Sequence, residues 1–158
     1  MDGTDRPRVI VGVAVSLAGL RALRVAAAQA RSRGAVLHTV RAWQYEPVAG
    51  PAIGLWARAA QRAAGDAIVR AFAETMGGIP DDIAVRGVVV SGSPGEALVR
   101  YADRDDDLLV VGCGRHGRLG RLLSRRVGRF CSTHASCPVL VVPPDTSAHP
   151  TAQTARPT

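Results

Sequence analysis

The sequence predicts an α/β domain: a five-stranded, parallel, doubly wound sheet of strand order 3-2-1-4-5, covered by four helices in a flavodoxin- or Rossmann-like three-layer sandwich. Two observations favour this fold class. Short apolar segments rich in β-branched residues alternate strictly with longer amphipathic segments, and right-handed crossovers turn that pattern into a parallel sheet. The chain is also 47% hydrophobic but only 4% aromatic, as expected of a core built from Val, Leu, Ile and Ala.

The first half of the chain contains two strand–helix units. Residues 9–15 form a short apolar run that predicts a buried strand, and apolar residues at helical spacing continue from there to Gly34, which suits a helix end. Residues 35–42 predict the second strand, and residues 51–76 predict a long alanine-rich helix. The expected inward face of that helix has a period close to 3.6 residues and comprises Ile53, Trp56, Ala60, Ala64, Ile68 and Phe72.

The second half continues the alternation. Residues 83–90 predict the third strand, and the Ser-Pro-Gly-Glu sequence at 93–96 predicts a helix start with a capping box and proline at the first helical position. The acidic run 105–107 precedes the fourth strand, 108–111, and we expect it to solvate a turn rather than to bind a metal. An amphipathic helix is expected over residues 119–130.

We divide the 158 residues into a flexible N-terminus (1–7), one domain (8–143) that closes with the fifth strand, 139–142, and a disordered tail (144–158) rich in Pro, Thr and Ala. No apolar run has the length of a membrane span or the form of a signal peptide. We therefore expect a cytoplasmic protein that contacts no membrane and keeps its three cysteines reduced.

The charge of the chain is strongly positive. All 20 basic side chains are Arg, and the net charge of +7 favours anionic ligands such as phosphates, nucleic acid or an acidic partner. Codon bias in the source genome explains the same Arg content equally well, so the charge alone assigns no function.

A glycine-rich turn follows the fourth strand, at the edge of the sheet where open α/β folds bind ligands. Gly112, Gly114 and Gly117 permit tight turns and close backbone approach, and the helix that follows offers free N–H groups to a phosphate. Arginines that could pair with phosphate oxygens crowd the same segment: Arg115, Arg118, Arg121, Arg125, Arg126 and Arg129. The alternative interpretation is a solvated outer helix face.

Cysteine and histidine recur at a spacing that can ligate zinc, as Cys113 with His116 and Cys131 with His134. A helix between the two pairs rises ~1.5 Å per residue and would hold them roughly 20 Å apart, which disfavours a shared ion. His38 lies within a strand pattern and is expected to be partly covered rather than a general base. We predict no metal site, no catalytic residue and no enzyme, although a weak ATPase activity stays open.

Over residues 6–143 the sequence resembles a single-domain universal stress protein. The resemblance rests on the segments VIVGVAVS, LHTVRAW, SGSPGEALV and DDDLLVVG, and above all on the glycine-rich turn and the closing HASCPVLVVP. For ATP-binding members of that family it implies two signatures. One is an Asp soon after the first strand, and the other is a Gly-x-x-Gly followed, nine residues later, by Gly and Ser or Thr.

The chain departs from both signatures. Ala14 stands where the family has the Asp, and alanine cannot accept the hydrogen bonds of a carboxylate. Residues 114–117 supply the Gly-x-x-Gly, but nine residues after Gly117 the chain has Val127 and Gly128 instead of Gly and Ser. An alignment anchored on Val127 and the closing strand puts Arg125 and Arg126 in those places, so either alignment breaks the motif. The candidate nucleotide site therefore comprises Gly112, Gly114, Arg115, His116, Gly117, Arg125, Arg126 and Val127, with Ala14 and Ala42 beside them.

The resemblance implies a non-enzymatic stress-response or regulatory module with weak or no ATP binding, and thus no expected cofactor. One alternative is a member that binds ATP or another adenine nucleotide. A second is an Arg-dependent binder of nucleic acid or of an acidic protein, disfavoured for nucleic acid by the scarcity of aromatic residues. The resemblance also implies an unidentified regulatory partner and a homodimer through the apolar last strand, Val139, Leu140, Val141 and Val142.

Overall fold

The computed structural model describes residues 6–14, 16–44, 53–113 and 118–143, with backbone alone for residue 53 and residues 118–125. The candidate residues Gly114, Arg115, His116 and Gly117 lie outside the described part, as does the predicted tail. Nine elements alternate along the chain: β1 (Arg8–Gly12), α1 (Leu17–Arg33), β2 (Val36–Trp43), α2 (Ile53–Met76), β3 (Val85–Ser91), α3 (Pro94–Tyr101), β4 (Leu108–Gly112), α4 (Arg118–His134) and β5 (Val139–Val142).

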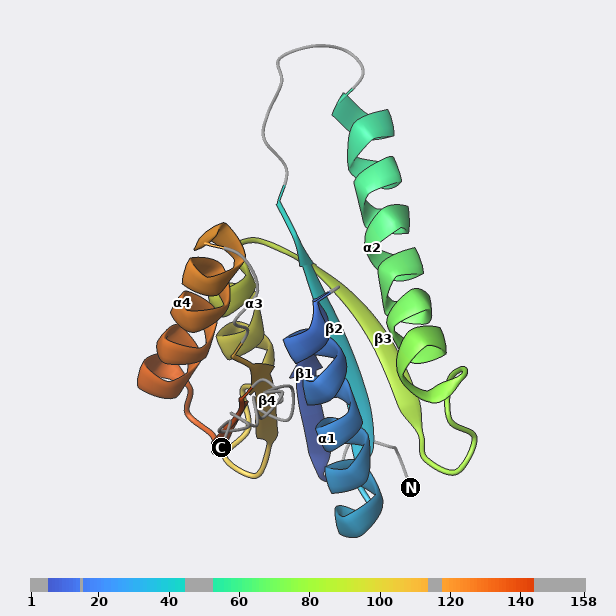
Figure 1. The fold of residues 1–158 in the computed structure, drawn as a ribbon, viewed down its shortest axis with the longest axis vertical. Coiled ribbons are helices and arrows are strands. Elements are labelled where there is room, and N and C mark those ends of the chain that lie inside the picture. The colour runs from blue at the N-terminus through green and yellow to red at the C-terminus, as the bar shows by residue number, and fades with distance from the viewer. Residues whose placement is uncertain (1–5, 15, 45–52, 114–117, 144–158) are drawn as a thin grey trace, which may run out of the picture.

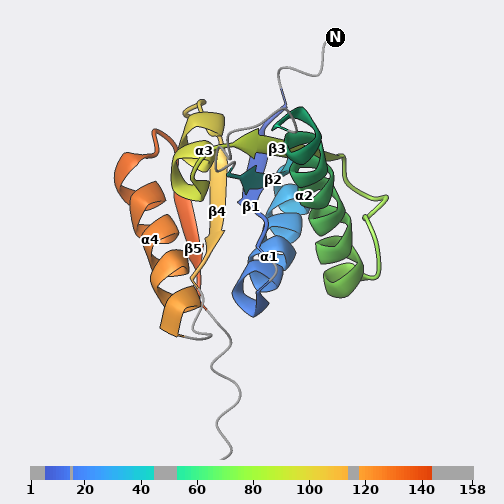
Figure 2. The same ribbon diagram turned by 90° about the horizontal axis from the view of Figure 1, so that it is seen from above.

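The strands form one parallel sheet in the order β3-β2-β1-β4-β5, which confirms the predicted fold class. Helices α1 and α2 cover one face and α3 and α4 cover the other, so that Figure 2 shows three layers. Strand boundaries differ from the predicted ones by at most three residues; the first strand, for example, ends at Gly12 rather than at residue 15. No helix of the described ranges is long and apolar enough to cross a membrane.

Alternating side chains of each strand feed two separate apolar cores. Val9 and Val11 of β1 point toward α1 and α2, whereas Ile10 points toward α3 and α4. Helix α1 packs closely because its buried face consists largely of alanine. Both of its ends are capped: the Ser16 hydroxyl accepts a hydrogen bond from the Gly19 N–H, and Gly34, the predicted helix end, takes a left-handed conformation at φ 60°.

Helix α2 corrects part of its predicted inward face. Ala64, Ile68 and Phe72 are buried as expected, but the Trp56 side chain is 67% exposed. The amino-terminal end of α2 extends beyond the end of β2, as Figure 1 shows, so no strand lies beneath this part of the helix. The apolar period of α2 therefore extends past the end of the sheet, and Trp56 has no strand to pack against.

The start of α3 also differs in detail from its prediction. Ser93 occupies the N-cap position and Pro94 follows it, but the Ser93 side chain makes no capping hydrogen bond. The fixed backbone of proline and the acidic Glu96 in the first turn favour the helix start without the reciprocal contacts of a capping box.

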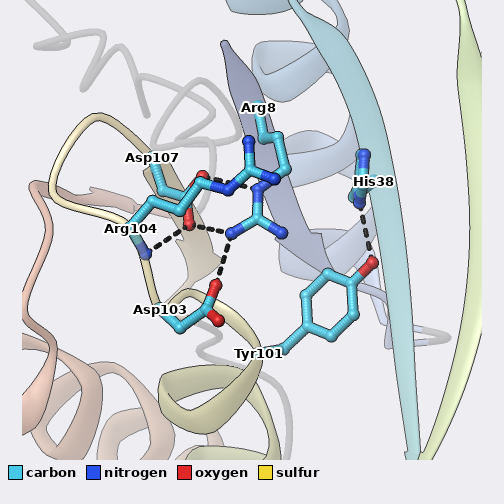
Figure 3. Close-up of polar contacts among 6 residues, drawn as sticks. All are labelled: Arg8, His38, Tyr101, Asp103, Arg104 and Asp107. Atoms are coloured by element: carbon cyan, nitrogen blue, oxygen red, sulfur yellow. Dashed lines mark hydrogen bonds and ion pairs between the residues drawn. The ribbon is translucent and has the colours of Figure 1, made fainter. Parts of the chain in front are cut away.

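An ion pair joins the amino ends of the two central strands. Arg8 Nε donates to Asp107 Oδ1 at 2.7 Å and Arg8 Nη2 donates to Asp107 Oδ2 at 2.5 Å, with a further 2.7 Å contact from Nη2 to Asp103 (Figure 3). Asp107 also accepts a hydrogen bond from the Arg104 backbone N–H. The prediction of a solvated acidic run is therefore wrong for Asp107, which is 1% exposed, whereas Asp105 next to it in the run is exposed.

The carboxyl end of β4 lies directly against the start of α1. A Cβ atom added at Gly112 would lie 2.5 Å from the backbone oxygen of Ala18, and one added at Gly19 would lie 2.2 Å from the backbone oxygen of Ala14. These contacts involve backbone atoms that cannot rotate away. Glycine at both positions is thus a packing requirement of the fold.

We expect Asp107→Ala to lower the free energy of unfolding by about 3–5 kcal/mol, because it leaves the largely buried Arg8 guanidinium without its bidentate partner. Asp105→Ala, in the same loop, should change it by less than about 0.5 kcal/mol. Urea unfolding of both variants measures the difference, and equal losses would contradict a structural role for this ion pair.

Gly112→Ala should destabilise the protein by about 1–3 kcal/mol, because the new methyl group forces α1 away from β4. Gly65→Ala is the matched control, since a Cβ atom there meets nothing within 4 Å, and it should stabilise α2 by about 0.5–1 kcal/mol. The two variants must therefore shift the urea midpoint in opposite directions. A neutral Gly112→Ala would rule out the packing role.

Candidate functional site

A crevice of about 230 Å³ opens at the carboxyl ends of β1, β2 and β4. The strand order reverses between β1 and β4, where open α/β sheets usually bind ligands. Its lining comes from six of the nine described elements and their adjoining loops: Gly12, Val13, Ala14, Ser16, Gly19, Val40, Arg41, Ala42, Pro94, Leu98, Val111, Gly112 and Val127.

The inner wall of the crevice is apolar. Val40 and Val111 rise from the ends of β2 and β4, and Leu98 of α3 and Val127 of α4 face them from the helical layer. Gly12 keeps this wall compact, because a Cβ atom there would lie 2.9 Å from the Leu98 side chain. An apolar wall between a sheet and helices suits a flat, uncharged ring better than a charged group.

Arg41 is the only charged side chain among the described residues that line the crevice. It is half-buried, and its Nη1 donates a 2.8 Å hydrogen bond to the Val13 carbonyl oxygen in the loop that follows β1. That bond holds the guanidinium beside Ala14, the position at which the resemblance implies an Asp. Within the described ranges Arg41 makes no ion pair, so its charge is available to an anion.

The crevice holds little that could perform catalysis. No carboxylate, histidine or cysteine is among its described lining residues. The Ser16 hydroxyl is engaged at the N-cap of α1, where it accepts from the Gly19 N–H at 3.2 Å. A serine nucleophile requires a base within hydrogen-bond reach, and the described lining offers none.

The structure brings together some of the predicted site residues. Ala14, Ala42, Gly112 and Val127 all line the crevice, although they come from four separate segments of the chain. The exposed Arg126 is not among the lining residues. The side chain of Arg125 and residues 114–117 lie outside the described part, so their predicted roles stay predictions.

The cysteines and His38 lie away from the crevice lining. Cys131 and Cys137 are buried free thiols, and burial raises the pKa of Cys131 to about 11. The described residues contain no group of three or more potential metal ligands, and the predicted partner His116 lies outside them. His38 is a covered strand residue, as predicted, and is hydrogen-bonded to Tyr101.

Sequence reasoning missed Arg41, Pro94 and Leu98 as crevice residues. A signal for Arg41 was available, because an arginine that interrupts an apolar strand near its carboxyl end points to the ligand-binding edge of a parallel sheet. No comparable signal existed for Leu98, whose spacing is that of any core residue on a short helix. Only the packing of α3 against the sheet brings it to the crevice.

Residues 6–143 match the model of the universal stress protein family. Solved structures with the same fold include the universal stress protein UspA from Lactobacillus plantarum, at 20% identity and a TM-score of 0.68, with 87% of this chain and 97% of that chain covered. A universal stress protein in complex with cAMP is 29% identical, with a TM-score of 0.57 and coverage of 89% and 98%. No curated protein sequence is significantly similar.

A family protein from Arabidopsis thaliana with AMP bound is 18% identical, with a TM-score of 0.56, and the match covers 92% of this chain and 97% of that chain. At this identity the similarity is one of fold.

Proposed function

The chain belongs to the universal stress protein family, and we propose that it is a non-enzymatic regulatory module whose crevice takes an adenine nucleotide with one phosphate in preference to Mg²⁺–ATP. The observation that carries this proposal is the hydrogen bond from Arg41 to the Val13 carbonyl oxygen: the crevice has a guanidinium next to Ala14, the position at which the family's ATP-binding signature has a carboxylate.

The apolar wall supports the base-binding part of the proposal. The aliphatic side chains of Val40, Leu98 and Val111 offer a surface against which a planar ring can stack while leaving water. The structure that is 29% identical is a complex with cAMP, a nucleotide that carries an adenine ring and one phosphate. Both observations favour the adenine-nucleotide alternative over an empty crevice.

The charge of the crevice supports the binding of a ligand that has one phosphate group and no bound metal ion. Mg²⁺ binds through carboxylates and phosphate oxygens, and the described lining contains no carboxylate to share in holding it. One guanidinium can pair with one phosphate group in bidentate geometry. A triphosphate brings more negative charge than Arg41 balances, so Mg²⁺–ATP gains less from this crevice than AMP or cAMP does.

The absence of a nucleophile–base pair among the described lining residues supports a binding role rather than a hydrolytic one. On this basis the nucleotide acts as an effector that the protein holds. An ATPase assay can test this role. If the wild-type chain hydrolyses ATP weakly and Arg41→Gln does not change the rate, the hydrolysis takes place outside the crevice.

Calorimetric titration tests the nucleotide proposal. AMP should bind with a lower Kd than ATP with magnesium, and Arg41→Gln should weaken AMP binding about 10- to 100-fold, because it removes a charge-assisted hydrogen bond. Arg70→Gln, an exposed site on α2, removes the same charge away from the crevice and should leave the Kd unchanged. Tighter binding of ATP with magnesium, or an equal loss in both variants, would contradict the proposal.

Ala14→Asp provides the converse test, because it restores a carboxylate beside Arg41. We expect this variant to bind AMP more weakly, since the new carboxylate pairs with the guanidinium, and to make ATP binding dependent on magnesium. Repeating both titrations with and without EDTA measures that dependence. An AMP affinity equal to wild type would show that Arg41 is not the phosphate partner.

We also propose that the chain forms a homodimer through β5. This strand lies at the edge of the sheet, paired on one side with β4, and its apolar Val141 side chain is 39% exposed. The unpaired backbone groups of an apolar edge strand are a template for pairing with another chain. Light scattering at micromolar concentration should give twice the 16.5 kDa chain mass, and Val141→Asp should halve the measured mass. A monomeric wild type would contradict this proposal.

A further inference from the structure

A second cavity, of about 260 Å³, lies at the opposite edge of the sheet from the crevice, near the amino ends of β1, β2 and β3. Its described lining contains four arginines together with one histidine, one tyrosine and one valine: Arg6, Arg8, Arg86, Arg104, His38, Tyr101 and Val36. We call this feature the arginine cavity. It shares no lining residue with the crevice.

The strand register brings these side chains to one face. Ile10, His38 and Arg86 stand side by side on β1, β2 and β3, and Arg8 precedes Ile10 by two residues and shares its face. Tyr101, the last residue of α3, covers this row, and Figure 3 shows its hydroxyl directed at His38. The arginine cavity is thus built by the core of the fold rather than by a loose loop.

The charge in the arginine cavity is unbalanced toward the positive. The aspartates that face it, Asp103 and Asp107, both bind Arg8. Among the described residues, four arginines line the cavity, and the two carboxylates beside it are both held by Arg8. Arg86 is exposed on β3 and makes no ion pair within the described ranges, so its guanidinium is free for a ligand.

The floor of the arginine cavity supplies a neutral donor. His38 is 5% exposed, and its Nδ1 lies 2.7 Å from the Tyr101 hydroxyl. Burial and the positive charges of Arg8, Arg86 and Arg104, opposed by Asp107, lower the pKa of His38 to about 4. The imidazole is therefore neutral at pH 7, and in either tautomer the pair retains one further N–H or O–H to donate.

We propose that the arginine cavity binds the phosphate group of a small phosphorylated molecule as a dianion. Every polar side-chain type that lines it presents a donor, and guanidinium groups match phosphate oxygens in bidentate geometry. A phosphate monoester is largely a dianion at pH 7.5, because its second pKa is about 6. The volume exceeds the roughly 30 Å³ of one water molecule several-fold, which leaves room for a small organic group.

The test uses probes without an adenine ring, because such probes gain nothing from the apolar wall of the nucleotide crevice. Glycerol 3-phosphate and inorganic phosphate are titrated into the full chain at pH 7.5 and followed by calorimetry and by the NMR signals of the His38 ring. We expect saturable binding of one equivalent. A bound dianion near the imidazole should raise the pKa of His38 by about one unit or more, because it favours the charged ring.

Three arginine variants locate the binding. Arg86→Gln should weaken it at least 10-fold, whereas Arg70→Gln on α2 and Arg41→Gln in the crevice should leave it unchanged, with all three variants melting at the wild-type temperature. Tighter binding of glycerol 3-phosphate than of inorganic phosphate would identify a phosphate monoester as the ligand, and the reverse order would identify the free ion.

Three results would overturn the proposal. They are the absence of saturable binding of either probe, equal losses in Arg86→Gln and Arg70→Gln, and loss of binding in Arg41→Gln alone. The last result would assign the phosphate to the crevice.

Discussion

The bidentate ion pair between Arg8 and Asp107 sets how the two central strands meet. Each residue stands one position before the first pair that joins β1 to β4, Val9 with Leu108. Removing two charges from water is costly, and a slip in register would leave both without their partner. The crevice at the far end of these strands therefore depends on a polar contact at the near end.

Fold and ligand chemistry are encoded by different residues around the crevice. Gly112 belongs to the family's glycine-rich turn, yet its missing side chain makes room for the backbone of Ala18 in α1. The charge of the crevice instead comes from Arg41, which is held against the loop that contains Ala14. A chain can thus keep the glycine that the architecture requires while it exchanges the charged groups that choose the ligand.

The strand order and the helices could be predicted because alternation of short apolar and long amphipathic segments fixes the topology. Three positions show where that reasoning ends. Periodicity predicts that Trp56 faces inward, but it does not reveal where α2 extends past the end of the sheet. The run of three aspartates suggests that Asp107 is solvated. Its partner Arg8 is 99 residues away, and only the pairing of β1 with β4 brings the two together. The role of Arg41 likewise depends on a hydrogen bond to a residue 28 positions away, which no local pattern contains.

Arg8 and Asp107 are 99 residues apart in the chain, which has a consequence for folding during synthesis. Strands β1, β2 and β3 with their helices leave the ribosome well before β4, so one edge of β1 stays open in the meantime. Parallel pairing over such a separation is slow, and open apolar edges invite other chains. The guanidinium at the start of β1 places a charge on that edge. Arg8, which joins β1 to β4 in the folded sheet, thus also disfavours pairing of the open β1 edge with other chains before β4 is made.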